Sequence, residues 1–202
     1  VTPDAQRTMY TYIGACSLLS PKDINEELVK NSNIVYLEGY CWEEQLAKES
    51  LIKAAEIAHK VGNKVSLTLS DPFCVKRHRS EFKDLINKHI DILFANEDEV
   101  KELCETEEFE ESGREISNMT EIAAITRGAK GAKIYNRKEI VDIESVVFHT
   151  VKDTTGAGDL FAAGFLYGLS KKFSILKSGK IASITAGEII NHFGARPEKS
   201  LK

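Results

Sequence analysis

Short apolar runs alternate along this chain with longer segments in which apolar residues recur every three or four positions. Runs of about four to six residues are typical of buried strands, and the periodic segments are typical of amphipathic helices. The predicted strands are residues 7–12, 34–37, 65–69, 90–94, 122–126, 132–135 and 139–143. The predicted helices are residues 23–30, 42–61, 80–88, 97–104, 112–119, 159–169 and 176–192.

This alternation predicts an α/β fold, with a mainly parallel sheet that helices cover on both faces. Ligands bind such sheets at the carboxyl ends of the strands. The loops after Leu69, Phe94, Thr126 and Val151 are therefore the places where a site is expected. The chain has no internal repeat, low-complexity tract or clear linker, which predicts a single domain over residues 1–202.

Two local patterns refine these elements. The predicted helix over 42–61 has a buried stripe that includes Leu46, Ile52, Ala55 and Ile57. Asp71 and Pro72 predict a break in the chain before a helix that starts at Ser80, because a residue that precedes proline disfavours helical backbone. That helix places Phe82, Leu85 and Ile86 on one side.

Composition and charge narrow the class of protein. The 202 residues are 42% hydrophobic and carry a net charge of −4, which is ordinary for a globular chain and argues against broad binding to nucleic acid or to anionic membranes. No apolar run is long enough to span a bilayer. The cysteines lie far apart without a Cys-x-x-Cys pair, which disfavours a zinc site or a disulfide framework and fits a cytoplasmic location.

The most informative stretch is the glycine-rich turn at residues 153–159, which runs directly into an apolar helix. Gly156 and Gly158 let backbone N–H groups approach a ligand, and the helix start adds unpaired N–H groups and a positive dipole end. An ordinary strand-to-helix turn that binds no ligand would show these same features. Because two aspartates and the apolar helix occur with the glycines, we favour an anion site with Asp159 as a base beside it.

Two other motifs lie at predicted strand ends. Asn96 followed by Glu99 is a capping box, and the same pair can also organise magnesium and its waters if the capped helix presents Glu99 to solvent. Residues 126–131 form either a basic turn between two strands or a phosphate loop built from the Thr126 hydroxyl and the backbone of Gly128 and Gly131.

Several site classes have no counterpart in this sequence. The P-loop pattern is absent, and the dinucleotide pattern fails after Gly158 because Phe161 stands where glycine is needed. The Gly-x-Ser-x-Gly elbow of hydrolases is absent as well. The histidines show no metal-ligand spacing, and Arg7 taken alone reads as a solvated charge.

Taken together, these residues resemble the ribokinase-like, or PfkB-type, carbohydrate and nucleoside kinases. The match is to the second glycine-rich pattern of that family, read here at 153–159. It extends to 96–99, 126–131 and the tail at 191–197, in family order over nearly the whole chain. Within the family, residues 4–9 and the tail look most like the adenosine-kinase-like sugar kinases. The resemblance implies a three-layer α/β/α ribokinase-like core.

The resemblance also implies catalytic roles. Asp159 matches the catalytic base of the family, and Gly156, Ala157 and Gly158 match its anion hole. Arg7 resembles an arginine that some adenosine-kinase-like members point at the transferred phosphate.

The roles implied for nucleotide and ions come from other segments. Asn96 and Glu99 match a pair linked to magnesium and phosphate, with Glu99 reaching Mg²⁺ through water. Asn191 falls where the family lines the adenine pocket. Asp153 and the 194–196 turn fall where many members hold a monovalent cation such as K⁺. The loop matched to the nucleotide phosphates consists of Thr126, Gly128 and Gly131.

The expected activity is ATP-dependent phosphorylation of an alcohol group on a small sugar or nucleoside, with Mg²⁺. No nucleic-acid or membrane partner is expected, and the full-length protein is expected to form a homodimer. The first residue is Val1 rather than Met, and the family's first glycine-rich pattern, most of its lid and most of its acceptor contacts are not visible, so upstream residues are expected. A non-catalytic nucleotide-binding module, an inactive truncated kinase and an α/β oxidoreductase are the alternatives.

Overall fold

The computed structural model describes residues 1–5, 7–12, 14–198 and 200. Contacts within the chain divide it into two compact units. The first unit comprises Val1–Thr11, Thr126–Ile134 and Ile140–Lys202. The second unit comprises Tyr12–Ile125 and Tyr135–Glu139. The predicted single domain over 1–202 stays a prediction.

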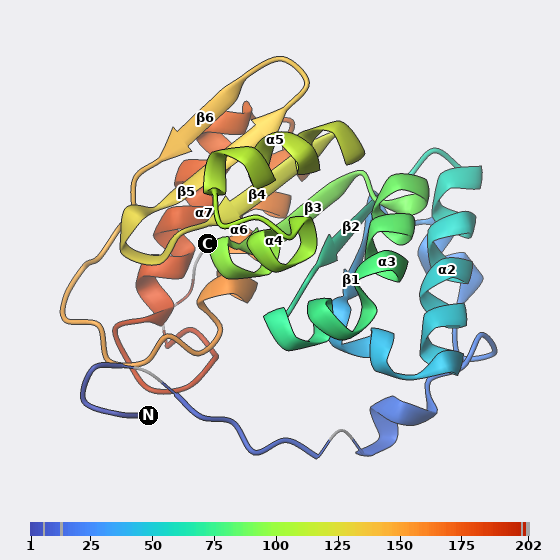
Figure 1. The fold of residues 1–202 in the computed structure, drawn as a ribbon, viewed down its shortest axis with the longest axis horizontal. Coiled ribbons are helices and arrows are strands. Elements are labelled where there is room, and N and C mark those ends of the chain that lie inside the picture. Colours follow the sequence, from blue (N-terminus) through green and yellow to red (C-terminus); the bar gives the residue numbers. More distant parts are fainter. Residues whose placement is uncertain (6, 13, 199, 201–202) are drawn as a thin grey trace. The chain divides into compact units, whose positions relative to one another are not determined.

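The second unit alternates strands and helices (Figure 1). Its strands are β1 (Ile34–Glu38), β2 (Lys64–Thr68), β3 (Ile92–Asn96) and β4 (Ile122–Thr126), in that order across the sheet, and the last residue of β4, Thr126, belongs to the first unit. Its α-helices are α1 (Glu26–Lys30), α2 (Gln45–Lys60), α3 (Pro72–His89), α4 (Glu97–Cys104) and α5 (Phe109–Met119), with 3₁₀ turns η1 (Gly14–Leu18) and η2 (Gly39–Glu43). Strands β1, β2 and β3 pair in parallel, which confirms the predicted parallel sheet for these strands.

The first unit contains a hairpin and two long helices (Figure 1). These elements are η3 (Gly128–Lys130), β5 (Ala132–Asn136), β6 (Ile140–Ile143), α6 (Ala157–Ser170) and α7 (Ile175–Ile189), and the last two residues of β5 belong to the second unit. The alternation of strands and helices over the described residues confirms the predicted α/β class.

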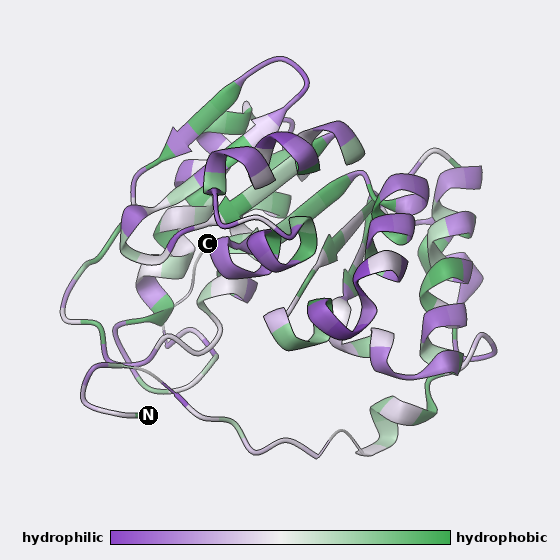
Figure 2. Cartoon of the chain, viewed as in Figure 1, coloured by the Kyte–Doolittle hydropathy of each residue, from purple (hydrophilic) through white to green (hydrophobic). Residues whose placement is uncertain are grey.

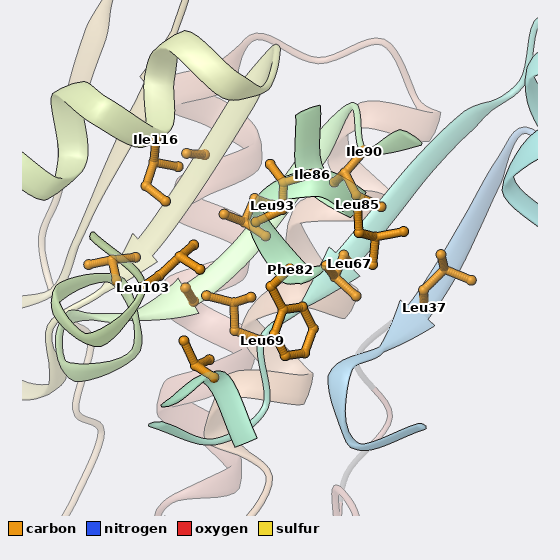
Figure 3. Packing of buried hydrophobic residues seen from close by; sticks show 14 of the residues in the cluster. Leu37, Leu67, Leu69, Phe82, Leu85, Ile86, Ile90, Leu93, Leu103 and Ile116 are labelled. Atoms are coloured by element: carbon orange, nitrogen blue, oxygen red, sulfur yellow. The ribbon is translucent and has the colours of Figure 1, made fainter. Parts of the chain in front are cut away.

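The core of the second unit lies between its strands and helices. Phe82, Leu85 and Ile86 of α3 are all buried, as predicted, and the Phe82 ring lies beside Leu67 and Leu69 (Figure 3). Burial of each such side chain contributes about 1.5–3 kcal/mol. Figure 2 shows why the elements pack this way: β3 is mainly hydrophobic, whereas α2 alternates between hydrophobic and hydrophilic residues.

A charged network fastens the amino ends of the strands in the second unit. The Asp91 carboxylate accepts from the Val65 N–H at 2.8 Å and from Lys64 Nζ at 2.9 Å, and His59 Nε2 lies 3.0 Å from it. Lys64 Nζ also donates to Glu121 Oε2 at 2.8 Å. Burial opposes ionisation of Asp91, but these donors outweigh it and lower the pKa of the carboxyl.

Three details of the sequence-based prediction are wrong. Residues 7–12 form no strand in the described structure. Helix α3 begins at Pro72 rather than at Ser80, because proline suits the first helical position and the Asp71 side chain accepts from the N–H groups that follow. Leu46 is 51% exposed, so the buried face of α2 lies elsewhere on that helix.

Helices α6 and α7 lie side by side at close range (Figure 1). A Cβ placed on Gly164 would lie 2.4 Å from the Thr185 hydroxyl, and one on Gly168 would lie 2.5 Å from the Ser178 hydroxyl. Glycine is therefore required at both positions for this packing. Of the helices in the described residues, none has the length and apolarity needed to cross a membrane.

Candidate active site

Helix α6 begins with an open amino end. Gly156 is the N-cap in a left-handed conformation, with φ 80° and ψ 1°, and it offers no side chain to cap the helix. Ala157 and Gly158 follow as the first helical residues, and Asp159 is exposed in the first turn. The Ala157 N–H bonds the Thr154 carbonyl at 3.2 Å, at the long end for such a bond. This helix start is thus suited to bind an anion.

Asp153 holds the turn that leads into α6. Its carboxylate accepts from the Thr155 hydroxyl at 2.6 Å, from the Thr155 N–H at 2.9 Å and from the Gly194 N–H at 3.0 Å. The Thr155 hydroxyl first, and then the two backbone N–H groups, lower the pKa of Asp153 to about 2. The carboxylate is therefore ionised at neutral pH.

A cavity of about 490 Å³ lies within the first unit, in front of the α6 start. It brings together the predicted phosphate loop and part of the predicted anion hole. The lining residues from these two motifs are Thr126, Gly128, Ala129, Gly131, Ala157 and Gly158. A cavity of this size suits a nucleotide-sized ligand.

The phosphate loop depends on its glycines. Gly128 and Gly131 have φ values of 55° and 82°, which side-chain-bearing residues rarely adopt. A Cβ on Gly131 would lie 2.0 Å from the Ile143 carbonyl oxygen, so no other residue fits there. The Arg127 N–H closes the loop by donating to the Gly131 carbonyl at 2.7 Å. The backbone of this loop is thereby held against the cavity.

Part of the cavity wall comes from α7, and no pattern in the sequence analysis predicted it. The residues of α7 and its end that line it are Ser183, Ala186, Gly187 and Ile190. Ser183 donates to the Glu144 carbonyl at 2.6 Å and accepts from the Val146 N–H at 3.1 Å, which ties residues 144–146 to the helix. The spacing of small residues along one helix face is the signal that could have identified this wall.

Other predicted site residues of the first unit lie outside the set that lines the cavity: Arg7, Asp153, Gly156, Asp159 and Asn191. The Asn191 amide accepts from the His149 N–H at 3.0 Å and donates to the Gly187 carbonyl, so it fastens the segment next to the cavity. Arg7 is exposed, and its Nη1 lies 3.4 Å from the Thr154 hydroxyl, at the turn before α6.

Asn96 and Glu99 belong to the second unit and contact each other. The Asn96 side chain accepts from the Glu99 N–H at 2.8 Å, and the Glu99 carboxylate accepts from the Asn96 N–H at 2.9 Å and from its Nδ2 at 2.7 Å. The predicted capping box is therefore confirmed. Glu99 is only 4% exposed, so the expectation that it faces solvent is wrong.

Burial dominates the electrostatics of Glu99. It raises the pKa of the carboxyl to about 7, against the Asn96 N–H, which lowers it, and the charges of Asp71 and Asp98 act in the same direction as burial. Among the described residues, no three His, Cys, Asp or Glu side chains are grouped closely enough to hold a metal ion.

A family model identifies the class of protein to which this fold and site belong. The model for the pfkB family of carbohydrate kinases matches residues 1–201. The chain therefore belongs to the pfkB carbohydrate kinase family, and the resemblance inferred from its motifs is confirmed.

Particular members show how close the relationship is. The chain is 44% identical to a probable sugar kinase from Rhizobium etli, with a TM-score of 0.97. The match covers 100% of this chain and 61% of the Rhizobium etli chain. It is 42% identical to an adenosine kinase from Sinorhizobium meliloti, with a TM-score of 0.97. This match covers 100% of the present chain and 62% of the Sinorhizobium meliloti chain. A ribokinase from Lactococcus lactis is 28% identical over 84% of this chain and 51% of its own length. The chain thus spans less than two thirds of each of these proteins.

Proposed function

We propose that this chain carries the nucleotide-binding and base-bearing part of an ATP-dependent kinase that phosphorylates an alcohol group of a sugar or nucleoside. The observation that carries the proposal is the cavity of the first unit, which the 126–131 loop and the start of α6 line together. Membership of the pfkB family supports the same reaction class. The adenosine kinase and ribokinase among its relatives support a nucleoside or sugar as acceptor.

In the proposed reaction, the acceptor oxygen attacks the γ-phosphorus of ATP, the bond to the β–γ bridging oxygen breaks, and ADP leaves. Asp159 takes the proton of the acceptor hydroxyl, for which its exposed position in the first turn of α6 is suitable. The N–H groups of Gly156, Ala157 and Gly158 stabilise the charge on the transferred group. Ala157 would exchange its long bond to Thr154 for a phosphate oxygen. Arg7, beside Thr154, would add positive charge.

The remaining proposed roles concern nucleotide and ions. Thr126, Gly128 and Gly131 would contact the nucleotide phosphates, and Asn191 would support the adenine side of the cavity through its bond to His149. Mg²⁺, when bound, would neutralise phosphate charge. A role for Asn96 and Glu99 in holding it through water rests on the family motif alone, and it would require Glu99, which is buried and bonds Asn96 through both carboxylate oxygens, to become accessible. A monovalent cation at Asp153, a homodimer and a cytoplasmic location stay predictions.

A nucleotide-binding module without turnover is the second candidate. It is favoured by one specific observation: every residue that lines the cavity belongs to the first unit. That unit could hold a nucleotide without contributing to transfer.

One experiment separates the two candidates. The chain and its full-length parent are each mixed with ATP, Mg²⁺ and a panel of sugars and nucleosides, and ADP release is followed. ADP release that depends on one acceptor supports the kinase. Nucleotide binding without acceptor-dependent release from either protein supports the module, and no nucleotide binding contradicts both.

A further inference from the structure

Asp153 joins two segments that lie 41 positions apart in the sequence. One carboxylate oxygen, Oδ1, accepts from the N–H and the hydroxyl of Thr155, in the turn before α6. The other, Oδ2, accepts from the N–H of Gly194, in the tail after α7. Asp153 as a whole is 3% exposed, and its carboxylate makes all three bonds at 2.6–3.0 Å. It therefore fixes the turn and the tail against each other.

The two segments also touch directly at Gly156. A Cβ placed on Gly156 would lie 3.1 Å from the Cβ and 3.2 Å from the Cα of Ala195, closer than most real contacts of this kind. Gly156 has φ 80° and is the residue that turns the chain into α6. The position of Ala195 and the conformation of Gly156 thus depend on each other.

We propose that Asp153 is a positioning residue that couples the Gly194–Ala195 tail to the 154–158 turn and so orients the α6 N–H groups toward nucleotide phosphates. The inference rests on the proposed function, because it assumes that the α6 start binds phosphate. It gives Asp153 a role through hydrogen bonds to Thr155 and Gly194. That role does not require a cation at Asp153.

Asparagine at position 153 isolates this role. An asparagine has the same size, and its carbonyl oxygen can still accept from Thr155. The amide nitrogen of asparagine would then face the Gly194 N–H. Both groups are hydrogen-bond donors, so they repel each other and the bond to the tail is lost. The Asp153→Asn substitution therefore removes the tether to the tail and leaves the local turn nearly unchanged.

The first test is nucleotide binding by the chain, measured by calorimetry with ATP and with AMP. ATP carries the two phosphates that would reach the α6 start, and AMP does not. We expect Asp153→Asn to weaken ATP binding roughly ten-fold and to change AMP binding by less than about two-fold. The matched control is Asp142→Asn, the same substitution at an exposed residue of β6 that pairs with Lys133, and both affinities should be unchanged.

The second test is amide hydrogen exchange without nucleotide. Asp153→Asn should speed exchange both at residues 193–195 and at residues 155–158. Faster exchange in the tail alone, or equal losses of ATP and AMP affinity, would overturn the coupling. Wild-type chain that binds neither nucleotide would contradict the proposed function instead, and the exchange measurement would still decide whether tail and turn are coupled.

A third variant keeps the proposal testable if Asp153→Asn does not fold. Thr155→Val keeps Asp153 and its bond to Gly194 but removes the 2.6 Å bond from the hydroxyl. If Asp153→Asn does not fold, Thr155→Val should still weaken ATP more than AMP, by a smaller factor. An unchanged ratio of the two affinities in Thr155→Val would then overturn the proposal.

Discussion

Helices α4 and α6 both begin with an N-cap residue and carry an acidic residue three positions later, yet the two helix starts differ in how their N–H groups are satisfied. In α4 the N-cap Asn96 and the third residue Glu99 bond each other, and Glu99 is buried. In α6 the N-cap is Gly156, without a side chain, and the third residue Asp159 is exposed. The start of α4 satisfies its own N–H groups, and the start of α6 has no side chain that caps it.

The difference teaches how function is distributed between similar elements. Capping by a side chain stabilises a helix by about 0.5–2 kcal/mol. The chain has such a cap at α4, whereas at α6, where a cavity lies at the helix start, the N-cap is a glycine that costs roughly a few tenths of a kcal/mol relative to the best caps. An uncapped helix start beside a cavity is therefore a better sign of an anion site than a glycine pattern alone.

The largest expected effect is on catalysis at α6. Asp159→Asn in the full-length protein should lower acceptor-dependent ADP release about 10³-fold, because no base remains to take the proton. ATP affinity should stay nearly unchanged. Asp142→Asn is the control and should turn over normally. Turnover by Asp159→Asn equal to that of the wild type would show that the exposed acid of α6 is not the base.

The next effect concerns the buried acid of α4. The pKa of Glu99 is raised to about 7 from 4.5, so its contribution to stability is complete below the unfolded pKa and is lost as the pH rises through about 7. Between about pH 5 and about pH 8 the wild type should lose about 2 kcal/mol relative to Glu99→Gln. Urea unfolding at both pH values measures this.

The control for that experiment is Asp142→Asn, which changes an exposed acid that is not among the groups that shift the pKa of Glu99. It should unfold with the same pH dependence as the wild type. Parallel pH profiles for the wild type and Glu99→Gln would mean that Glu99 is ionised without penalty and that the two helix starts are more alike than proposed.

A smaller effect is expected at the N-cap of α6. Gly156→Ala should destabilise the chain by about 1–2 kcal/mol, because alanine is strained at φ 80° and its Cβ crowds Ala195. Gly158→Ala is the control for stability, since a Cβ there meets no atom within 4 Å. Thermal unfolding of the two variants compares them, and equal melting temperatures would contradict the assigned turn.

The smallest effect is expected at the N-cap of α4. Asn96→Ala removes one side-chain bond to the Glu99 N–H and one to its carboxylate, and should cost about 1 kcal/mol in urea unfolding. Asn87→Ala, at an exposed asparagine near the end of α3, should cost less. If the two variants were equally stable, the self-capped start of α4 would contribute nothing.

Much of the fold could be predicted from the sequence, because the strands and helices of the second unit have clear hydrophobic periods. The errors arose where local and tertiary effects compete. Residues 7–12 have the alternation of a strand, but a strand needs a partner, and sequence patterns do not reveal one. From the sequence alone, Pro72 predicts a break in the chain. In the structure it is the first residue of a helix, because the Asp71 side chain caps the N–H groups that follow.

The candidate site was predictable in its motifs and not in its connections. Turn 153–159 stands out because two aspartates and an apolar helix occur with its glycines, and loop 126–131 because a threonine and two glycines follow a predicted strand. The bond from Gly194 to Asp153 and the wall formed by Ser183 join residues far apart in sequence. The burial of Glu99 likewise depends on neighbours that a local pattern does not specify.

The Asp91 network has an evolutionary consequence. It fastens the amino ends of β2 and β3 through Lys64 and Val65, at the end of the sheet opposite the start of α4. A sheet secured at one end tolerates exchange of the loops at its other end, where ligands are bound. Such an arrangement lets one inherited scaffold acquire new substrates through loop changes while its foldability is preserved.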